Sequence, residues 1–441
     1  MRSFFLSLIC AQVALLSFSQ KSPVEYPAAG SIHPNAKYID ADELGPFIKG
    51  TAVIRKGNAE AMIDSAGAFV IGFNKYRIVM LPLRFTDGLS QGTLDIPGGN
   101  GIYIASPANV PLNTTHLINS KGKVIFTAPA GYEIVRHNVG HNAAMDAPVE
   151  GKLATIPKRT TDLTKFGDDI MVFPDGNVMR FPSFSDVHYS EGMLAWLDKA
   201  TKKWGFKNLK GVTVIKPQYE YALSFSEGLV AVAKKDEFKE IKWGYINKKG
   251  VEVIPFKFSN QPGSFGNGLA WVEPKAGGEN KYVFIDTTGE VKISIPVNSE
   301  LRRSLFIGGQ VDSKFSHGFL VLNKDYDKLM DIHEIVYDSK SIMRLFGLDE
   351  SLKLQPYPFY NGWMYVLDSK RDGRKVGMIN LADRSKVPPV FQSLSMFDPV
   401  SNLAYAKLKI DGEAGKGEKF VEGYVNREGV FVMVKKKGAE W

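Results

Sequence analysis

The stretch KWGYINKKGVEVIP, residues 242–255, consists of two short apolar runs on either side of a polar turn. The first run, WGYI, is rich in aromatic and β-branched residues, which favour strands. Asn247 and Gly250 mark the turn, because asparagine hydrogen-bonds to its own backbone and glycine accepts the positive φ of a tight hairpin. The second run stops at Pro255, which cannot donate to a ladder. The stretch therefore predicts a β-hairpin.

The same pattern recurs about 39 residues upstream, and a weaker copy follows downstream. Trp204-Gly205 begins the upstream copy, which ends in a turn at Gly211. A second signature, Phe-Ser-Glu-Gly-Leu, stands at 225–229, and related sequences start at Phe265 and Phe315. Internal periodicity of this kind is typical of repeat arrays.

Nine copies can be followed at a spacing of about 44 residues. A glycine that precedes an apolar strand marks eight of them, and Asn402 marks a degraded ninth: Gly50, Gly101, Gly151, Gly192, Gly228, Gly268, Gly318 and Gly362. A second strand with a polar turn follows each: 62–67, 117–122, 171–176, 206–211, 245–250, 283–289, 335–340, 378–384 and 424–429. Copies four to six match best.

Each unit is predicted to be a three-stranded antiparallel meander, with room for a fourth short strand before the Phe-Ser-Glu-Gly signature. One such sheet cannot bury enough apolar surface to fold alone, whereas stacked neighbours can. We therefore expect an all-β array of about nine three- to four-stranded units. Nine exceeds the usual four to eight propeller blades, so a propeller-like ring and an open curved array both remain open. On this interpretation Trp243 packs between units, the alternative being an aromatic platform for sugars.

The pattern resembles the WG (or KWG) repeat of secreted bacterial proteins. Trp204-Gly205 and Trp243-Gly244 carry the name-giving dipeptide, and residues 225–229 carry the second signature. The resemblance is specific over about 190–320 and extends by spacing to about 45–435. It implies an architecture and transfers no site residue.

These observations predict the domain organisation. Residues 1–19 form a signal peptide, 20–44 a lead segment, 45–435 the repeat array and 436–441 a C-terminal tail. An insertion at about 322–358 has helix-favouring composition near residues 341–347. Further long spacings, 50–101 and 101–151, could carry function on loops.

The N-terminus has the features of an export signal. Arg2 precedes a short apolar core, and Ser17 and Ser19 are small residues just beyond it. The only cysteine, Cys10, lies within that core, so the mature chain is expected to lack disulfides, thiol catalysis and cysteine-based zinc sites. We expect an exported protein that is periplasmic, at the cell surface or extracellular, without a transmembrane span.

Few residues suggest chemistry. His137 and His141 have a helical metal-pair spacing with Asp146 nearby, but Gly140 separates them and the zinc-hydrolase glutamate is missing. The other candidates are turn histidines, His317 and His333 with Glu334, and a glycine-rich stretch at 411–419 that lacks phosphate-loop spacing. Asp64, Asp286 and Asp338 recur at the turn position shared with Asn247. Lys248 and Lys249 are expected to be solvated turn residues. We therefore assign no catalytic, cofactor-binding or metal-binding residue.

The chain has a net charge of +8, but its basic residues are scattered along the sequence. No nucleic-acid partner is therefore expected. The favoured function is a non-enzymatic binding or interaction scaffold, with a protein or glycan partner. The alternative is a carbohydrate-active enzyme on a propeller-like scaffold, which would gather carboxylates about 5–10 Å apart at one mouth.

We expect the mature protein to start at Gln20, because Ser17 and Ser19 would be the residues three and one before the cleavage site, where signal peptidase requires small side chains. N-terminal sequencing of exported material tests this. A retained Met1, or a lipid attached to Cys10, would show the interpretation to be wrong.

Overall fold

The structure is a computed structural model. It describes residues 29–79, 102–107, 116–127, 132–136, 152–157, 169–172, 178–181, 187–208, 210–272, 281–296, 315, 317–321, 328–360, 362–368, 374–410 and 419–436. These residues form nine small sheets, numbered here 1 to 9 in chain order, and one short helix.

The first three sheets each have four strands. Sheet 1 contains β2 (Glu43–Ile48), β3 (Thr51–Lys56), β4 (Ala59–Asp64) and β5 (Phe69–Ile71); sheet 2 contains β6 (Tyr76–Val79), β7 (Ile102–Pro107), β8 (His116–Asn119) and β9 (Val124–Thr127); sheet 3 contains β10 (Tyr132–Arg136), β11 (Lys152–Pro157), β12 (Asp169–Val172) and β13 (Val178–Phe181).

The middle sheets cover the best-matching repeats. Sheet 4 contains β14 (Val187–Ser190), β15 (Met193–Asp198), β16 (Lys203–Asn208) and β17 (Thr213–Tyr219); sheet 5 contains β18 (Tyr221–Ala222), β19 (Leu229–Lys235), β20 (Ile241–Asn247) and β21 (Glu252–Phe258); sheet 6 contains β22 (Leu269–Val272), β23 (Lys281–Asp286) and β24 (Val291–Pro296).

The last three sheets include the single described helix. Sheet 7 contains β25 (Phe319–Val321), β26 (Lys328–Asp331) and β27 (Val336–Asp338), followed by α2 (Ser339–Leu345); sheet 8 contains β28 (Lys353–Tyr360), β29 (Trp363–Asp368), β30 (Lys375–Asn380) and β31 (Lys386–Phe391); sheet 9 contains β32 (Ser393–Leu394), β33 (Ala404–Ile410), β34 (Lys419–Val425), β35 (Phe431–Lys435) and, from the N-terminal side, β1 (Ile32–Ile39).

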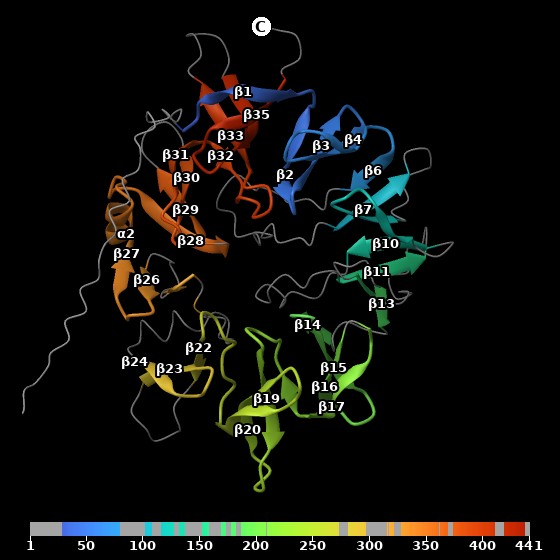
Figure 1. The fold of residues 1–441 in the computed structure, drawn as a ribbon, viewed down its shortest axis with the longest axis vertical. Helices are drawn as coiled ribbons and strands as arrows, with labels where there is room; N and C mark the ends of the chain where they lie inside the picture. Colours follow the sequence, from blue (N-terminus) through green and yellow to red (C-terminus); the bar gives the residue numbers. More distant parts are fainter. Residues whose placement is uncertain are drawn as a thin grey trace, which may run out of the picture.

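The nine sheets follow one another around a ring (Figure 1). Its two ends meet in sheet 9, where β1 pairs in parallel with β35, from Ile32 opposite Phe431 to Ile39 opposite Lys435. The chain then enters sheet 1, whose strand β2 is next to sheet 9 (Figure 1). Of the two architectures left open by the sequence, the structure has the ring. Its closure joins the two ends of the array through backbone hydrogen bonds.

The expected repeat positions are confirmed. The second strand of each four-stranded sheet from 1 to 5 and in sheet 8, and the first strand of sheets 6 and 7, begins directly after one of the eight marker glycines. The fourth strand foreseen before the Phe-Ser-Glu-Gly signature is also present, for example as β18 ahead of Phe225. The expected helix within 322–358 is α2. No helix in the described ranges is long and apolar enough to span a membrane.

The hairpin between the last two strands of a sheet is built by an Asn or Asp side chain. In sheet 5, Asn247 Oδ1 accepts the backbone N–H of Lys249 at 2.9 Å and that of Val251 at 3.1 Å. Gly250 completes the turn with φ of 80°. The same pair of bonds is made by Asp64, Asn119, Asn208, Asp286, Asp331 and Asn426.

The sequence pattern predicts Asp338 at this turn position, and that prediction is wrong. Asp338 does not make the hairpin of sheet 7, because that turn belongs to Asp331, with His333 and Glu334 inside it. Asp338 instead caps the N-terminus of α2, where its carboxylate accepts the N–H of Ser341 at 2.7 Å. The sequence pattern misled because the short strands of this unit place two aspartates seven residues apart.

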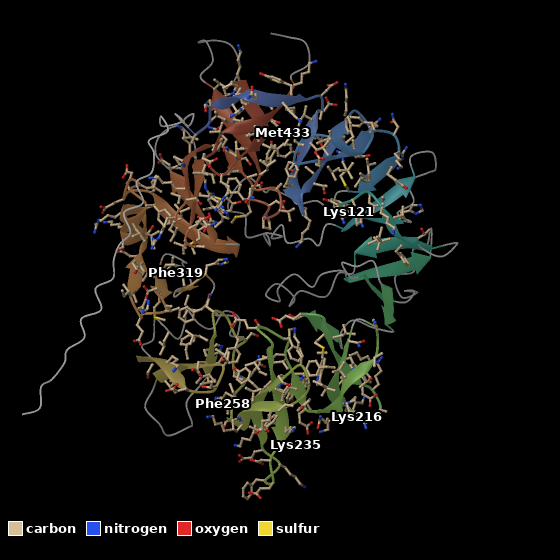
Figure 2. The ribbon with its side chains drawn as sticks, viewed as in Figure 1. Lys121, Lys216, Lys235, Phe258, Phe319 and Met433 are labelled. Carbon is tan, nitrogen blue, oxygen red and sulfur yellow. The ribbon has the colours of Figure 1, made fainter. Side chains whose placement is uncertain are left out.

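The hydrophobic core lies between neighbouring sheets. Trp243 of sheet 5, with 6% of its surface exposed, packs with Ile285 of sheet 6, which confirms packing for this tryptophan. At the closure, Phe47 of sheet 1 meets Tyr424 of sheet 9, with ring centroids 4.7 Å apart, and Met433 joins the same cluster (Figure 2). Burial of this kind is the main stabilising term, and it exists only when units stack.

The glycine of the Trp-Gly pair has a steric role. In sheet 5, Trp243 pairs with Phe258 and Tyr245 with Ile254, so three residues of β21 bulge opposite Gly244 alone. A Cβ placed on Gly244 would lie 2.7 Å from the carbonyl oxygen of Ile254. Gly205 and Gly377 stand opposite the same three-residue bulge of the fourth strand. Gly423 pairs directly with Val434, but a Cβ there would also meet backbone, 2.1 Å from the carbonyl oxygen of Met433. The dipeptide is therefore required by a close approach of two backbones.

We expect Gly244→Ala to lower the free energy of unfolding by about 1–3 kcal/mol, the usual cost of overpacking, because backbone rather than a flexible side chain blocks the methyl group. Gly72→Ala is the matched control, since no atom lies within 4 Å of the position that its Cβ would take and its φ is not positive. Urea unfolding of both variants measures the difference. Equal midpoints would contradict the steric explanation.

Candidate functional site

The Phe-Ser-Glu-Gly signature forms the turn between the first and second strands of a sheet. The residue before the glycine adopts a left-handed conformation in each described copy, with φ of 49–53° at Glu191, Glu227, Asn267, His317 and Lys49. The expectation that His317 shares the position of Glu227 and Asn267 is thus confirmed. In these five copies the turn places a polar side chain directly before the marker glycine.

Those polar side chains hold the turn of the next unit. Glu191 accepts the N–H groups of Glu227 at 2.6 Å and Gly228 at 3.0 Å. Glu227 in turn accepts the N–H of Gly268 at 2.8 Å, and Asn267 accepts that of Gly318 at 3.0 Å. The contacts form a directional series, which we call the turn seam, from sheet 4 to sheet 7.

The turn seam also crosses the closure of the ring. Asp398 of sheet 9 accepts the N–H of Lys49 at 2.7 Å with one carboxylate oxygen, and that of Gly50 at 3.0 Å with the other. Asp398 is buried, with 4% of its surface exposed. Sequence reasoning missed this residue, because the ninth copy is degraded and its acid lies four residues before Asn402. The signal for it was its position directly after Phe397, in the place of the signature serine.

The signature serine adds a second contact between units. Ser190 donates its hydroxyl to the carbonyl of Phe225 at 2.6 Å, and Ser226 donates to the carbonyl of Phe265 at the same distance. The phenylalanines of the signature are buried. The Phe-Ser-Glu-Gly signature is therefore a set of inter-unit contacts.

Lys248 belongs to the same seam. Its ammonium lies 3.1 Å from Glu191 Oε2 and donates to the carbonyl oxygen of Glu191 at 2.9 Å. Lys248 is a turn residue with 43% of its side chain exposed, as expected, but its turn in sheet 5 also reaches across to Glu191 of sheet 4, which was not foreseen. Partial burial by itself would raise the pKa of Glu191, but the hydrogen bonds from Lys248, Gly228 and Glu227 outweigh it, and the pKa is lowered.

The carboxylates that gather on this face are therefore engaged. Each oxygen of Glu191 and of Asp398 accepts a backbone N–H, as does Glu227 Oε2. Among the described residues, no group of three or more His, Cys, Asp or Glu side chains could hold a metal ion. His137, His141, Asp146 and the stretch 411–418 lie outside the described ranges.

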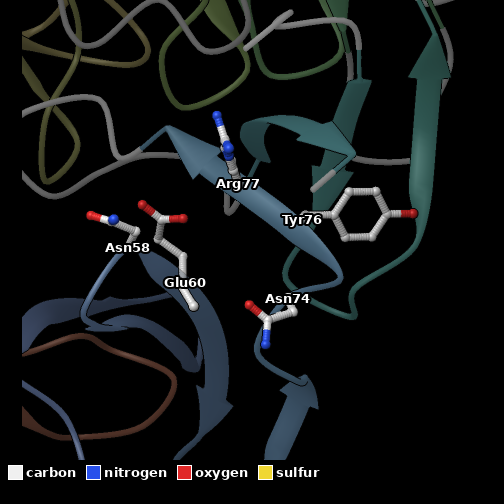
Figure 3. Close-up of a pocket in the computed structure, with 6 residues that line it drawn as sticks. Asn58, Glu60, Asn74, Tyr76 and Arg77 are labelled. Atoms are coloured by element: carbon white, nitrogen blue, oxygen red, sulfur yellow. The ribbon is translucent and has the colours of Figure 1, made fainter. Parts of the chain in front are cut away.

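A shallow pocket of about 250 Å³ opens elsewhere, at the junction of sheets 1 and 2 (Figure 3). Its lining residues come from the β3–β4 turn, the start of β4, the linker after β5 and strand β6: Asn58, Ala59, Glu60, Asn74, Tyr76 and Arg77. Sequence reasoning named none of them, because the pocket joins residues of two different units that carry no repeat signature. It combines a concave surface with several polar side chains.

The family of WG-containing repeats matches residues 204–237 and 243–275. The chain contains WG repeats. The two matched WG repeats run from β16 of sheet 4 to β22 of sheet 6, and they include Gly205 and Gly244 of the glycine bulge and Glu227 and Asn267 of the turn seam. No curated protein sequence matches the chain.

Solved structures similar to this WG-repeat chain are distant. An uncharacterized protein from Listeria monocytogenes is 9% identical, with 71% of this chain and 97% of that chain covered and a TM-score of 0.28. The β-propeller domain of the Trilobed protease from Pyrococcus furiosus, described as having an open velcro topology, is 11% identical over 88% and 95%, with a TM-score of 0.25. TolB from Acinetobacter baumannii is 10% identical over 58% and 78%, with a TM-score of 0.22. TM-scores this low carry no argument about the fold, so the assignment of a ring depends on the strand pairing within this structure.

The lowered pKa of Glu191 predicts how the seam responds to acid. A carboxylate whose pKa falls on folding stabilises the protein above its unfolded pKa, near 4.5, and that stabilisation is lost as the pH falls through the folded pKa. We expect Glu191→Gln to lower the free energy of unfolding at pH 7 by about 1 kcal/mol. The variant's free energy of unfolding should also fall less between pH 7 and acid pH than that of the unchanged chain.

Denaturant unfolding between pH 7 and pH 3 measures this. Glu237→Gln is the matched control, because Glu237 is an exposed carboxylate that no described residue pairs with. Identical pH profiles for the two variants would show that the seam contributes no pH-dependent stability.

Proposed function

We propose that this protein is an exported, non-enzymatic scaffold whose ring of WG-type units binds a protein or a glycan partner. The observation that carries the proposal is that the recurrent polar residues hydrogen-bond within the array. In the described units the signature glutamates, serines and turn asparagines hydrogen-bond to backbone groups within the array. They build the ring, so binding would use side chains outside the signature.

Exposed apolar side chains support a binding role. Val212 and Val214 at sheet 4, and Val251 and Val253 at sheet 5, stand on or next to the outermost strands with 37–58% of their surface exposed. The two sheets are neighbours, because Gly250 of the sheet 5 hairpin lies against Ile215 of β17. Apolar residues grouped on a surface are a common mark of an interaction face.

The carbohydrate-active alternative is disfavoured by the same hydrogen bonds. A glycoside hydrolase needs two carboxyl groups free to act on one glycosidic bond. Glu191 already binds two backbone amides and Lys248, and removing it from them would open the seam between sheets 4 and 5. An engaged carboxylate of lowered pKa is also a poor general acid near neutral pH.

The test uses the whole mature chain on an immobilised panel of envelope polysaccharides, oligosaccharides and peptidoglycan fragments, with released reducing ends measured in the same wells. We expect retention without new reducing ends. A second arm cross-links the chain to its neighbours in intact cells. In that arm, Val214→Glu with Val253→Glu should reduce a protein adduct, whereas Ile410→Glu, an exposed apolar residue of sheet 9, should not. Turnover of any oligosaccharide, lost in Glu227→Gln, would overturn the proposal.

A further inference from the structure

The pocket between sheets 1 and 2 contains an unusual carboxylate. Glu60 stands on β4 with only 9% of its surface exposed. Its Oε1 lies 3.3 Å from Arg55 Nε, while its Oε2 is buried and has no hydrogen-bond partner. A buried polar atom without a partner is uncommon in native proteins and calls for an unseen group that satisfies it.

The polar residues around Glu60 also have hydrogen-bonding capacity to spare. No described residue pairs with the side chains of Asn58, Asn74 or Arg77. Figure 3 shows Asn58 beside the Glu60 carboxylate, with Arg77 and Asn74 on other sides of the opening. The ring of Tyr76 turns away from them and lies near His116, with centroids 6.1 Å apart. The pocket is thus polar on several sides, and none of its described lining residues presents an aromatic ring to the opening.

The mixture of charges limits what fits. A metal cation would find one carboxylate opposed by Arg77, and an anion would find Arg77 opposed by Glu60. A carboxylate only accepts hydrogen bonds, a guanidinium only donates them, and the asparagine amides do both. A ligand that satisfies all of them needs several groups that donate and accept at once. Neighbouring hydroxyl groups on a neutral ring have this property.

We infer that this pocket is a subsite for a single neutral sugar residue, with one hydroxyl donating to Glu60 and others bonding Arg77 and the two asparagines. The inference rests on the proposed binding function and narrows it to a glycan at the junction of sheets 1 and 2. The absence of an aromatic platform makes the contact polar, so one sugar residue binds weakly, and a chain of residues would draw further affinity from the adjoining surface.

The experiment measures saturation-transfer difference NMR of neutral monosaccharides and oligosaccharides with the full mature chain, followed by titration of the best one. Glu60→Gln keeps the shape and removes the charge, and it should weaken binding about tenfold, as expected when a charged acceptor is lost. Asn74→Gly removes an amide from a position whose φ is 64°, so the backbone is undisturbed, and it should weaken binding several-fold.

Glu43→Gln is the matched control, because Glu43 pairs with the same Arg55, at 2.9 Å, and does not line the pocket. Its affinity should equal that of the unchanged chain. Circular dichroism melts confirm that each variant is folded.

Three outcomes overturn the inference: no neutral sugar gives a signal, Glu43→Gln weakens binding as much as Glu60→Gln does, or free amino acids bind more tightly than sugars. If a glycan binds but neither pocket variant alters it, the subsite is wrong while the scaffold function stands. If the chain retains no glycan or protein at all, the proposed function fails as well.

Discussion

Where the described residues show the junction between neighbouring turns, units of this ring are held together by a side chain that accepts backbone N–H groups of the following turn. Glu191, Glu227, Asn267 and Asp398 do so at four junctions, and the contact is directional, since every donor belongs to the following unit in the ring. A three- or four-stranded sheet has no independent core, so its strands acquire their burial only once this register between units is set. The rest of the structure depends on that constraint.

Much of the architecture could be predicted from the sequence, because the repeat applies the same local rules many times. Gly244 and Gly250 follow from sterics that act within one hairpin, one under a bulged strand and one at a positive φ. Asn247 follows from its bonds to residues two and four positions later. Such contacts are local, and nine copies make the signal visible even where a single copy is weak.

Contacts between units were harder to foresee. The lysine of KWGYINKKG was expected in solvent, yet Lys248 reaches Glu191, 57 residues earlier. Residues 20–44 were expected to be a lead segment outside the array, yet β1 of this segment pairs with β35. Asp398 stands in the place of the signature serine, but it makes the contact that a glutamate makes in sheets 4 and 5. Neither short-range spacing nor composition records which distant backbone a side chain meets. The polar pocket was missed for the same reason, since Glu60 and Arg77 come from different sheets.

The parallel pair of β1 and β35 sets the order in which this chain can become whole. About 400 residues separate the paired strands, so we expect the β1–β35 pairing to form after the local hairpins. The entropy cost of closing so long a loop is offset only by the contacts made on closure. Until then β35 is an edge strand of sheet 9, and sheet 1 lacks the neighbour that covers Phe47. A nascent or truncated copy would present both surfaces to other chains, and exposed strand edges are templates for intermolecular pairing. Completion of the ring thus covers β35 and Phe47, two surfaces that would otherwise be open to other chains.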